Sequence, residues 1–142
     1  MATVTRVLPW RRHHEAAAPV ELTPLLASYR RRHPKAPVAY RLGASFVPVR
    51  KAGKLPWAVV REEYQLEYGT DRLEIHRDAI HPDERILVVD DVLATGGTAA
   101  ATCRLVEALG GAIVGIGILI ELSELEGRAA LGERRLEALA SY

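Results

Sequence analysis

The chain has 142 residues, of which 49% are hydrophobic and 26% are charged, and its formal net charge is +1. This size and composition predict one globular domain with one core, and the near-neutral charge excludes a global field that attracts nucleic acid or an acidic membrane. The single cysteine, Cys103, cannot form an intrachain disulfide, and no apolar run has the length of a signal peptide or a bilayer span, so we expect a cytoplasmic protein with no membrane partner.

The N-terminal segment, residues 1–35, is basic and lacks a clear structural pattern. Residues 1–40 contain seven Arg or Lys and only two acids, with basic runs over 10–14 and 30–35. Such runs either contact nucleic acid or form a solvated terminus, and we favour the solvated terminus. Within the segment, the pattern of residues 22–27 predicts the start of a helix.

The next part of the chain predicts a helix end, a strand and a basic loop. Residues 38–42 finish a helix that Gly43 closes. The apolar run 44–49 predicts a buried strand. Residues 50–56 are basic and contain Gly53 and Pro56, which favours a loop.

Two further runs, 58–67 and 73–76, predict strands joined by a turn over 68–72. Their apolar alternation is weak and their charges are many. We therefore expect an exposed hairpin, followed by a polar connection over 78–84.

The second half of the chain shows the clearest pattern. Residues 85–89 form a β-branched apolar run that ends at Asp90 and Asp91, and a helix is predicted over 98–109. Four residues at helical spacing give this helix one face: Thr102, Leu105, Val106 and Leu109. Gly110 and Gly111 end it, and 112–120 predicts a second, fully buried strand.

A short helical piece over 124–131 and a last strand over 136–140 complete the chain. The strand, helix and strand before them have continuous apolar character, which predicts a right-handed βαβ unit in a parallel sheet. The fold class is therefore α/β.

The most informative stretch lies where the first buried strand meets the helix. Ligands of open α/β sheets bind outside the carboxyl ends of the strands. Gly96 and Gly97 let backbone N–H groups converge at the helix N-terminus, which predicts a phosphate site. Asp90 and Asp91 would repel a phosphate but suit ribose hydroxyls, which are O–H donors. The stretch therefore predicts a site for a phosphorylated sugar.

Residues 88–98 resemble the phosphoribosyl-diphosphate (PRPP) signature of the type I phosphoribosyltransferases. In that family, two acids hold the ribose 2- and 3-hydroxyls, and the following loop binds the 5-phosphate. The resemblance assigns the first role to Asp90 and Asp91. It assigns the second to Ala94, Thr95, Gly96, Gly97 and Thr98.

Three other segments, 46–56, 64–76 and 121–128, resemble the adenine phosphoribosyltransferases within this family. This resemblance implies that Arg50, Lys51 and Lys54 contact the diphosphate. It also implies a hairpin hood in which Glu67 and Tyr68 are catalytic, with Glu67 assisting the base or the developing cation. An ordinary exposed strand glutamate is the alternative for Glu67.

The resemblance also implies a fold and a reaction. The fold is a parallel sheet flanked by helices, with residues 36–142 as the phosphoribosyltransferase-like domain. The reaction makes AMP and diphosphate from adenine and PRPP in purine salvage, with Mg²⁺ bound mainly through PRPP. The family also implies a homodimer.

Upstream of Ala36 the resemblance ends. A strand, a helix and the turn that binds diphosphate in the family have no counterpart between Ala27 and Ala36, so the enzyme is either impaired or has a rebuilt N-terminal part. We favour impairment. The remaining alternatives are a non-catalytic PRPP- or nucleotide-binding regulator and a receiver-like domain, although the latter would have no phosphate loop after its acids.

Overall fold

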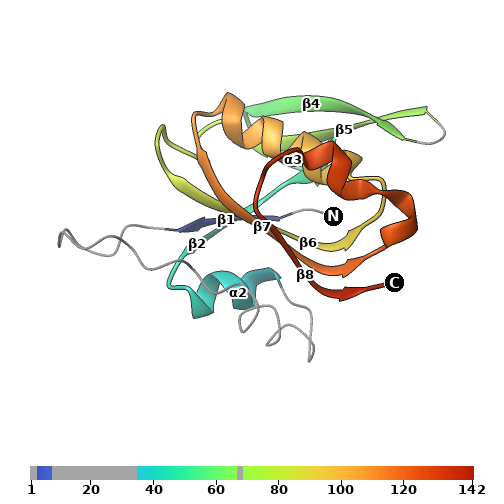
Figure 1. Cartoon of the computed structure of the whole chain (residues 1–142). Helices are drawn as coiled ribbons and strands as arrows, with labels where there is room; N and C mark the ends of the chain where they lie inside the picture. The colour runs from blue at the N-terminus through green and yellow to red at the C-terminus, as the bar shows by residue number, and fades with distance from the viewer. Residues whose placement is uncertain (1–2, 8–34, 67–68) are drawn as a thin grey trace.

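The computed structural model describes residues 3–7, 35–66 and 69–142, and it has two sheets with a helix between them (Figure 1). The elements of the larger sheet, in spatial order, are β2 (Ser45–Pro48), β1 (Thr3–Val7), β6 (Arg85–Leu93), β7 (Ala112–Glu121) and β8 (Leu136–Ser141). Those of the smaller sheet are β3 (Arg50–Lys51), β5 (Gly69–His76) and β4 (Val59–Leu66). The helical elements are α2 (Lys35–Arg41), α3 (Gly97–Ala108), η2 (Ser123–Leu125) and η3 (Gly127–Leu131).

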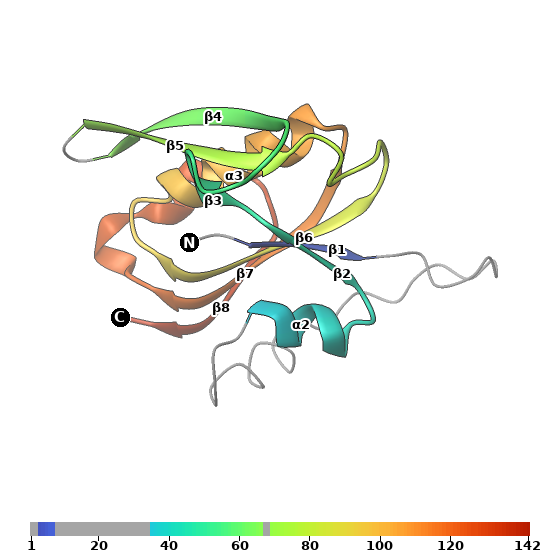
Figure 2. The same cartoon turned by 180° about the vertical axis from the view of Figure 1, so that it is seen from behind.

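The two faces of the larger sheet have different covers. Helix α3 packs between this sheet and the β4–β5 hairpin, and α2 lies on the opposite face (Figure 2). Val88 of β6 belongs to the main core under α3, whereas the neighbouring Val89 packs in a smaller cluster with Val38 of α2. This alternation is what a strand buried on both faces requires.

The predicted βαβ unit is confirmed. Strands β6 and β7 pair in parallel and α3 connects them. Three of the four predicted helix-face residues are fully buried, with Leu109 half-buried. The chain turns after α3 at Gly110, whose φ of 83° favours glycine. Strand β7 is not buried along its whole length as predicted: residues 115–118 and Glu121 are buried, whereas Ala112 is exposed and the remaining residues are half-buried.

Strand β1 is an element that the sequence analysis does not predict. It lies between β2 and β6 and pairs antiparallel with both. Its sequence, TVTRV, is rich in β-branched residues, which suit a strand. Strand β1 thus borders β6 on the side away from β7, and the sheet is parallel only over β6, β7 and β8.

Two details of the predicted elements are wrong. The β4–β5 hairpin is not an exposed arm, because Tyr64, Leu73 and Ile75 are buried against α3 and the core. Strand β6 does not stop at the two acids but continues to Leu93, because Val92 and Leu93 still pair with β7. Both errors have the same cause: a charged residue in a strand suggests exposure, although a neighbouring element can cover or pair with that part of the strand.

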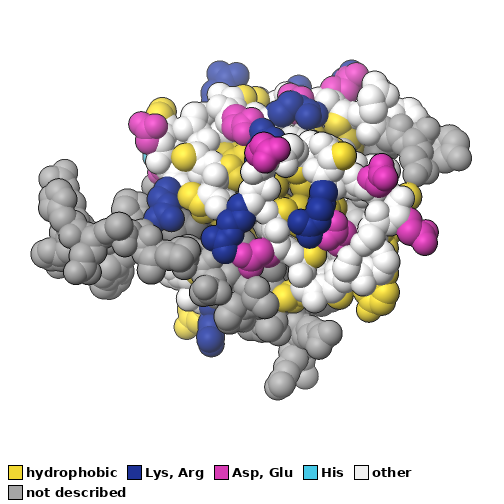
Figure 3. Space-filling model, in the orientation of Figure 1, with side chains coloured by type: hydrophobic (Ala, Val, Ile, Leu, Met, Phe, Trp, Pro, Cys, Tyr) yellow, Lys and Arg dark blue, Asp and Glu magenta, His cyan; other side chains and the backbone are white. Residues whose placement is uncertain are grey.

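The surface seen in Figure 3 has interspersed basic and acidic side chains rather than a large patch of one sign. No helix in the described part of the chain combines the length and the hydropathy that crossing a bilayer requires. The helix start over 22–27 and the basic runs over 10–14 and 30–35 lie outside the described residues.

Candidate functional site

The phosphate loop, defined here as residues 94–98, connects β6 to α3 at the carboxyl edge of the larger sheet. Gly96 is the N-cap of α3 with φ 81°, so no side chain caps the first turn of the helix. The N–H groups of that turn are therefore available to an anion, and the helix dipole favours negative charge there. A cavity of about 70 Å³ lies at this point, lined by Tyr64 and by residues 92–99.

The phosphate loop is supported from behind by η3. A Cβ on Gly96 would lie 2.3 Å from the carbonyl oxygen of Gly127, and a Cβ on Gly127 would lie 2.1 Å from that of Ala94. Two backbones approach this closely only where both residues are glycine. Gly127 is a residue that the sequence analysis quotes within a resembling segment without giving it a role.

An ion pair holds η3 in this place. Arg128 donates to both carboxylate oxygens of Glu121, at 2.6 and 2.7 Å. Glu121 is the last residue of β7 and is 7% exposed, and it lies beside Leu93 at the end of β6. The bidentate pair therefore joins the carboxyl ends of the two parallel strands to the segment that supports the phosphate loop.

The two acids of the motif have different surroundings. Asp90 is 2% exposed, whereas Asp91 is exposed. The backbone N–H of Asp91 donates to the Asp90 carboxylate at 3.0 Å. The accessible carboxylate is thus that of Asp91, and Asp90 is held within the strand just before the phosphate loop.

The hairpin reaches the phosphate loop through Tyr64. A Cβ on Gly97 would lie 3.2 Å from the carbonyl oxygen of Gln65 and 3.3 Å from the Tyr64 ring. The Tyr64 hydroxyl lies 3.5 Å from the hydroxyl of Thr98 and 3.5 Å from the carboxylate of Asp71. The sequence analysis does not single out Tyr64, although it is the one aromatic residue of β4.

The predicted diphosphate residues lie in a second pocket. Arg50, Lys51 and Lys54 line a cavity of about 450 Å³ together with Pro48 and Leu55. The structure thus groups the three cations together, but in a cavity lined by other residues than the phosphate loop. Strand β5 of the hairpin connects the three cations with the lining of the phosphate-loop cavity, because its residue Asp71 contacts both Lys51 and Tyr64.

Lys51 already has a partner on the hairpin. Its Nζ lies 2.7 Å from the Asp71 carboxylate. The hydrogen bond to Asp71 raises the pKa of Lys51, and the same bond, with one from the Arg72 N–H, lowers the pKa of Asp71. Both groups are therefore charged across the neutral range, and a diphosphate would compete with Asp71 for this lysine.

Glu67 and Tyr68, the predicted catalytic pair, lie outside the described residues. Within the described ranges, no three His, Cys, Asp or Glu side chains are grouped to hold a metal ion. Cys103 lies on α3 and is fully buried, and burial raises the pKa of its thiol to about 11. A neutral, covered thiol does not act as a nucleophile.

A parallel βαβ unit in which two acids precede a phosphate loop is the arrangement expected of a phosphoribosyltransferase. The sequence comparison agrees with this class. The phosphoribosyl transferase domain family matches residues 34–135. The chain belongs to this family.

Adenine phosphoribosyltransferases are among the relatives of this chain. The enzyme of Trichormus variabilis is 58% identical over 106 residues, which cover 75% of this chain and 62% of that protein. The crystal structure of the enzyme from Thermoanaerobacter pseudethanolicus matches with a TM-score of 0.74 at 53% identity, covering 75% of this chain and 62% of that one. The Saccharomyces cerevisiae enzyme, solved with adenine and an imino-altritol bisphosphate, matches with a TM-score of 0.69 at 43% identity, covering 72% of this chain and 57% of that one.

The predicted type I phosphoribosyltransferase fold is therefore confirmed. The chain spans about three fifths of the length of these relatives, 62% in the first case.

Proposed function

We propose that this protein is an adenine phosphoribosyltransferase, which makes AMP and diphosphate from adenine and PRPP in purine salvage. The observation that carries the proposal is the uncapped N-terminus of α3, which follows Asp90 and Asp91 after the short segment 92–96, in a chain that is 58% identical over 106 residues to a protein of that name. The crystal structure of the yeast relative holds adenine and a sugar bisphosphate analogue, which is the ligand chemistry proposed here.

Each part of the site has a chemical role in this proposal. Residues 94–98 hold the 5-phosphate with backbone N–H groups and the hydroxyls of Thr95 and Thr98. Asp90 and Asp91 accept hydrogen bonds from the ribose hydroxyls. A ring nitrogen of adenine then bonds to the anomeric carbon while the bond from that carbon to diphosphate breaks, and the nitrogen releases its proton.

The leaving diphosphate is assigned to Arg50, Lys51 and Lys54, whose positive charges suit it. We also propose magnesium, which would supply further positive charge to the diphosphate when bound. The donor set fits an ion that the substrate carries, because Mg²⁺ keeps several waters and binds through few protein carboxylates. Asp91, the accessible acid, is the residue whose carboxylate would face it.

Glu67 and Tyr68 complete the proposal as the catalytic pair of the hood, on the strength of the family resemblance. A hood is useful because water would intercept the cation-like sugar. We further propose that turnover is low, since the family's diphosphate turn has no counterpart between Ala27 and Ala36. A homodimer and a cytoplasmic location belong to the same proposal.

A non-catalytic regulator that binds PRPP is the alternative. The similarity to adenine phosphoribosyltransferases favours the transferase. The family match over residues 34–135 includes segment 64–76, which contains the proposed catalytic pair and which a sensor would not need.

The experiment incubates the full chain with adenine, PRPP and Mg²⁺ and measures AMP and diphosphate. Slow AMP formation that Glu67→Gln abolishes is expected, with thermal stabilisation by PRPP retained in that variant. Asp91→Asn should lose both AMP formation and thermal stabilisation by PRPP. Stabilisation by PRPP without any AMP would support the regulator, and the absence of both would refute the site.

A further inference from the structure

Glu74 is a fully buried carboxylate in the middle of β5, with an exposed fraction of 0%. Its neighbours Leu73 and Ile75 pack into the main core. Because successive side chains of a strand point to opposite faces, Glu74 points away from that core. A buried acid at such a position costs folding free energy unless hydrogen bonds satisfy it.

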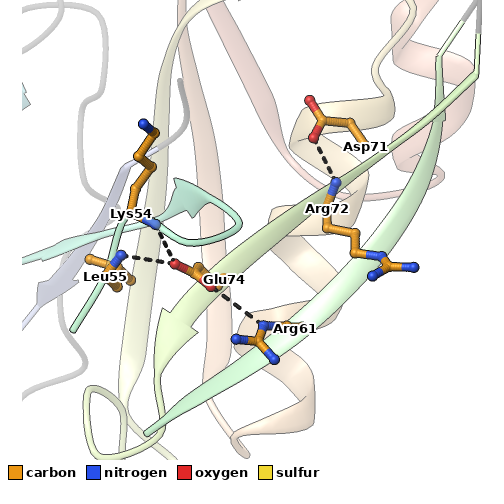
Figure 4. Close-up of polar contacts among 6 residues, drawn as sticks. All are labelled: Lys54, Leu55, Arg61, Asp71, Arg72 and Glu74. Carbon is orange, nitrogen blue, oxygen red and sulfur yellow. Dashed lines mark hydrogen bonds and ion pairs between the residues drawn. The ribbon is translucent and has the colours of Figure 1, made fainter. Parts of the chain in front are cut away.

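The partners of Glu74 are backbone groups of the segment that follows β3. One carboxylate oxygen accepts from the backbone N–H of Lys54 at 2.9 Å and from that of Leu55 at 2.8 Å (Figure 4). The other oxygen lies 3.5 Å from Nε of Arg61 on β4. Burial alone would raise the pKa of Glu74, but the N–H donors of Leu55, Gly53 and Lys54 and the Arg61 guanidinium outweigh it and lower the pKa.

These bonds determine the path of the basic loop, defined here as residues 50–55. Strand β3 pairs with β5 so that Arg50 lies opposite Glu74, and the N–H of Ala52 donates to the Arg72 carbonyl at 3.0 Å. The chain then reverses at Gly53, whose φ is 79°, and crosses back over Glu74. In Figure 4 the backbone N of Lys54 faces the carboxylate while its side chain extends away from it.

The carboxylate therefore closes the turn that carries Lys54, which lines the second pocket together with Arg50 and Lys51. We propose that Glu74 is a positioning residue of the diphosphate site: it anchors the backbone of residues 53–55 so that Lys54 joins Arg50 and Lys51 around one anion. The inference rests on the proposed function, in which this pocket takes the diphosphate. Its ligand class is an inorganic or organic diphosphate carried with Mg²⁺.

The sign of the effect separates positioning from simple charge. A carboxylate beside an anion site repels the anion, so its removal by charge alone tightens diphosphate binding. Positioning predicts the opposite, because the loop N–H groups lose their acceptor and the loop loses its path.

The experiment measures, by calorimetry on the full chain, the affinity for inorganic diphosphate with Mg²⁺ and the affinity for ribose 5-phosphate. The second ligand reports on the phosphate loop and the two acids and does not need the basic loop. The variants are Glu74→Ala and Glu74→Asp, the second of which keeps the charge but shortens the reach. Glu63→Ala is the matched control, since Glu63 is an exposed glutamate on β4 that pairs with Arg72 at 2.8 Å and removing it changes the net charge equally.

We expect diphosphate binding to weaken about tenfold in Glu74→Ala and about threefold in Glu74→Asp, because unmade buried hydrogen bonds cost this much. Ribose 5-phosphate affinity should stay within about twofold in both, and Glu63→Ala should bind both ligands as the parent does. A loss of ribose 5-phosphate binding would reveal that Glu74→Ala does not fold. In that case the diphosphate affinity of Glu74→Asp tests the inference.

Unchanged or tighter diphosphate binding in the folded Glu74 variants overturns the inference. So does a parent chain that binds ribose 5-phosphate but not diphosphate, and that result leaves the phosphate loop standing. A parent chain that binds neither ligand overturns the proposed function itself, and the inference with it.

Discussion

The phosphate loop and the basic loop serve neighbouring parts of one proposed substrate, but they are held in different ways. The phosphate loop is fixed by backbone against backbone, with Gly96 in contact with Gly127. The basic loop is tethered by the side chain of Glu74 and leaves three long cationic side chains around a wide pocket. Backbone N–H groups bind an anion well only when they are already in position. The long side chains of lysine and arginine can instead move with the leaving diphosphate.

The largest effect should come from breaking the glycine contact. In Gly96→Ala the new Cβ would lie 2.3 Å from the Gly127 carbonyl oxygen at a φ of 81°, so the variant combines overpacking with backbone strain. We expect ribose 5-phosphate affinity to fall by about a hundredfold, corresponding to roughly 3 kcal/mol.

Gly43→Ala is the matched control for this variant. It adds a methyl group at a φ of 60° with nothing within 4 Å, so it carries the backbone strain without the clash. Gly127→Ala should resemble Gly96→Ala, because its Cβ meets backbone atoms. Equal affinities in Gly96→Ala and Gly43→Ala would show that the close approach is not what shapes the phosphate loop.

The second largest effect concerns the reactivity of the Cys103 thiol, which reports on the packing of α3, the helix that follows the phosphate loop. Burial raises the pKa of its thiol from 9.0 to about 11, so below pH 9 the native thiolate fraction is about a hundredfold lower than in the unfolded chain. Alkylation at pH 8 should be slower by at least this factor in the native protein.

The same pKa has a consequence for stability. Because folding raises the pKa of the Cys103 thiol, the contribution of this group to the free energy of unfolding is complete below the unfolded pKa and is lost as the pH rises through about 11.

Rapid alkylation of the native protein at pH 8 would contradict the tight packing of α3. Gly96→Ala should speed alkylation if it loosens the helix start, and Glu74→Ala should not.

A smaller effect should follow from removing the ion pair that holds η3. Arg128→Gln leaves the carboxylate of Glu121, which is 7% exposed, without its bidentate partner, and we expect a loss of about 1–3 kcal/mol in the free energy of unfolding. Arg104→Gln breaks the more exposed pair with Glu62 and should cost less than about 1 kcal/mol. Denaturant titration of both variants measures the difference, and equal losses would refute a special role for Arg128.

The smallest effect concerns the ion pair between Lys51 of the basic loop and Asp71 of β5. The pKa of Asp71 is lowered, so its contribution to stability is present above the unfolded pKa and is lost as the pH falls through the folded value. The pKa of Lys51 is raised, so its contribution is complete below 10.5 and is lost as the pH rises through the folded value. Melting temperatures of Asp71→Asn should therefore fall less than those of the parent below pH 4, and parallel curves would show that the pair is not formed in solution.

Much of the proposed phosphate site could be located from the sequence, because its parts are local. A β-branched run, two acids and two glycines follow one another between residues 85 and 98, and such a strand and helix must meet where their shared loop lies. The basic cluster was likewise visible as a run of cations. The roles of Gly127, Tyr64 and Glu74 could not be predicted, since each depends on a partner from a distant part of the chain, and Glu74 reads as one more charge in a polar hairpin.

The sequence by itself determined the α/β class, the order of elements from β6 to β8 and the position of the proposed anion site, because hydrophobic period and turn chemistry act over a few residues. Only the tertiary structure decided that the hairpin covers α3, that β1 fills the place beside β6, and that a buried carboxylate shapes the basic loop. Those outcomes depend on which surfaces meet and exclude water, and the burial of a charged residue is decided by its partners rather than by its neighbours in the chain.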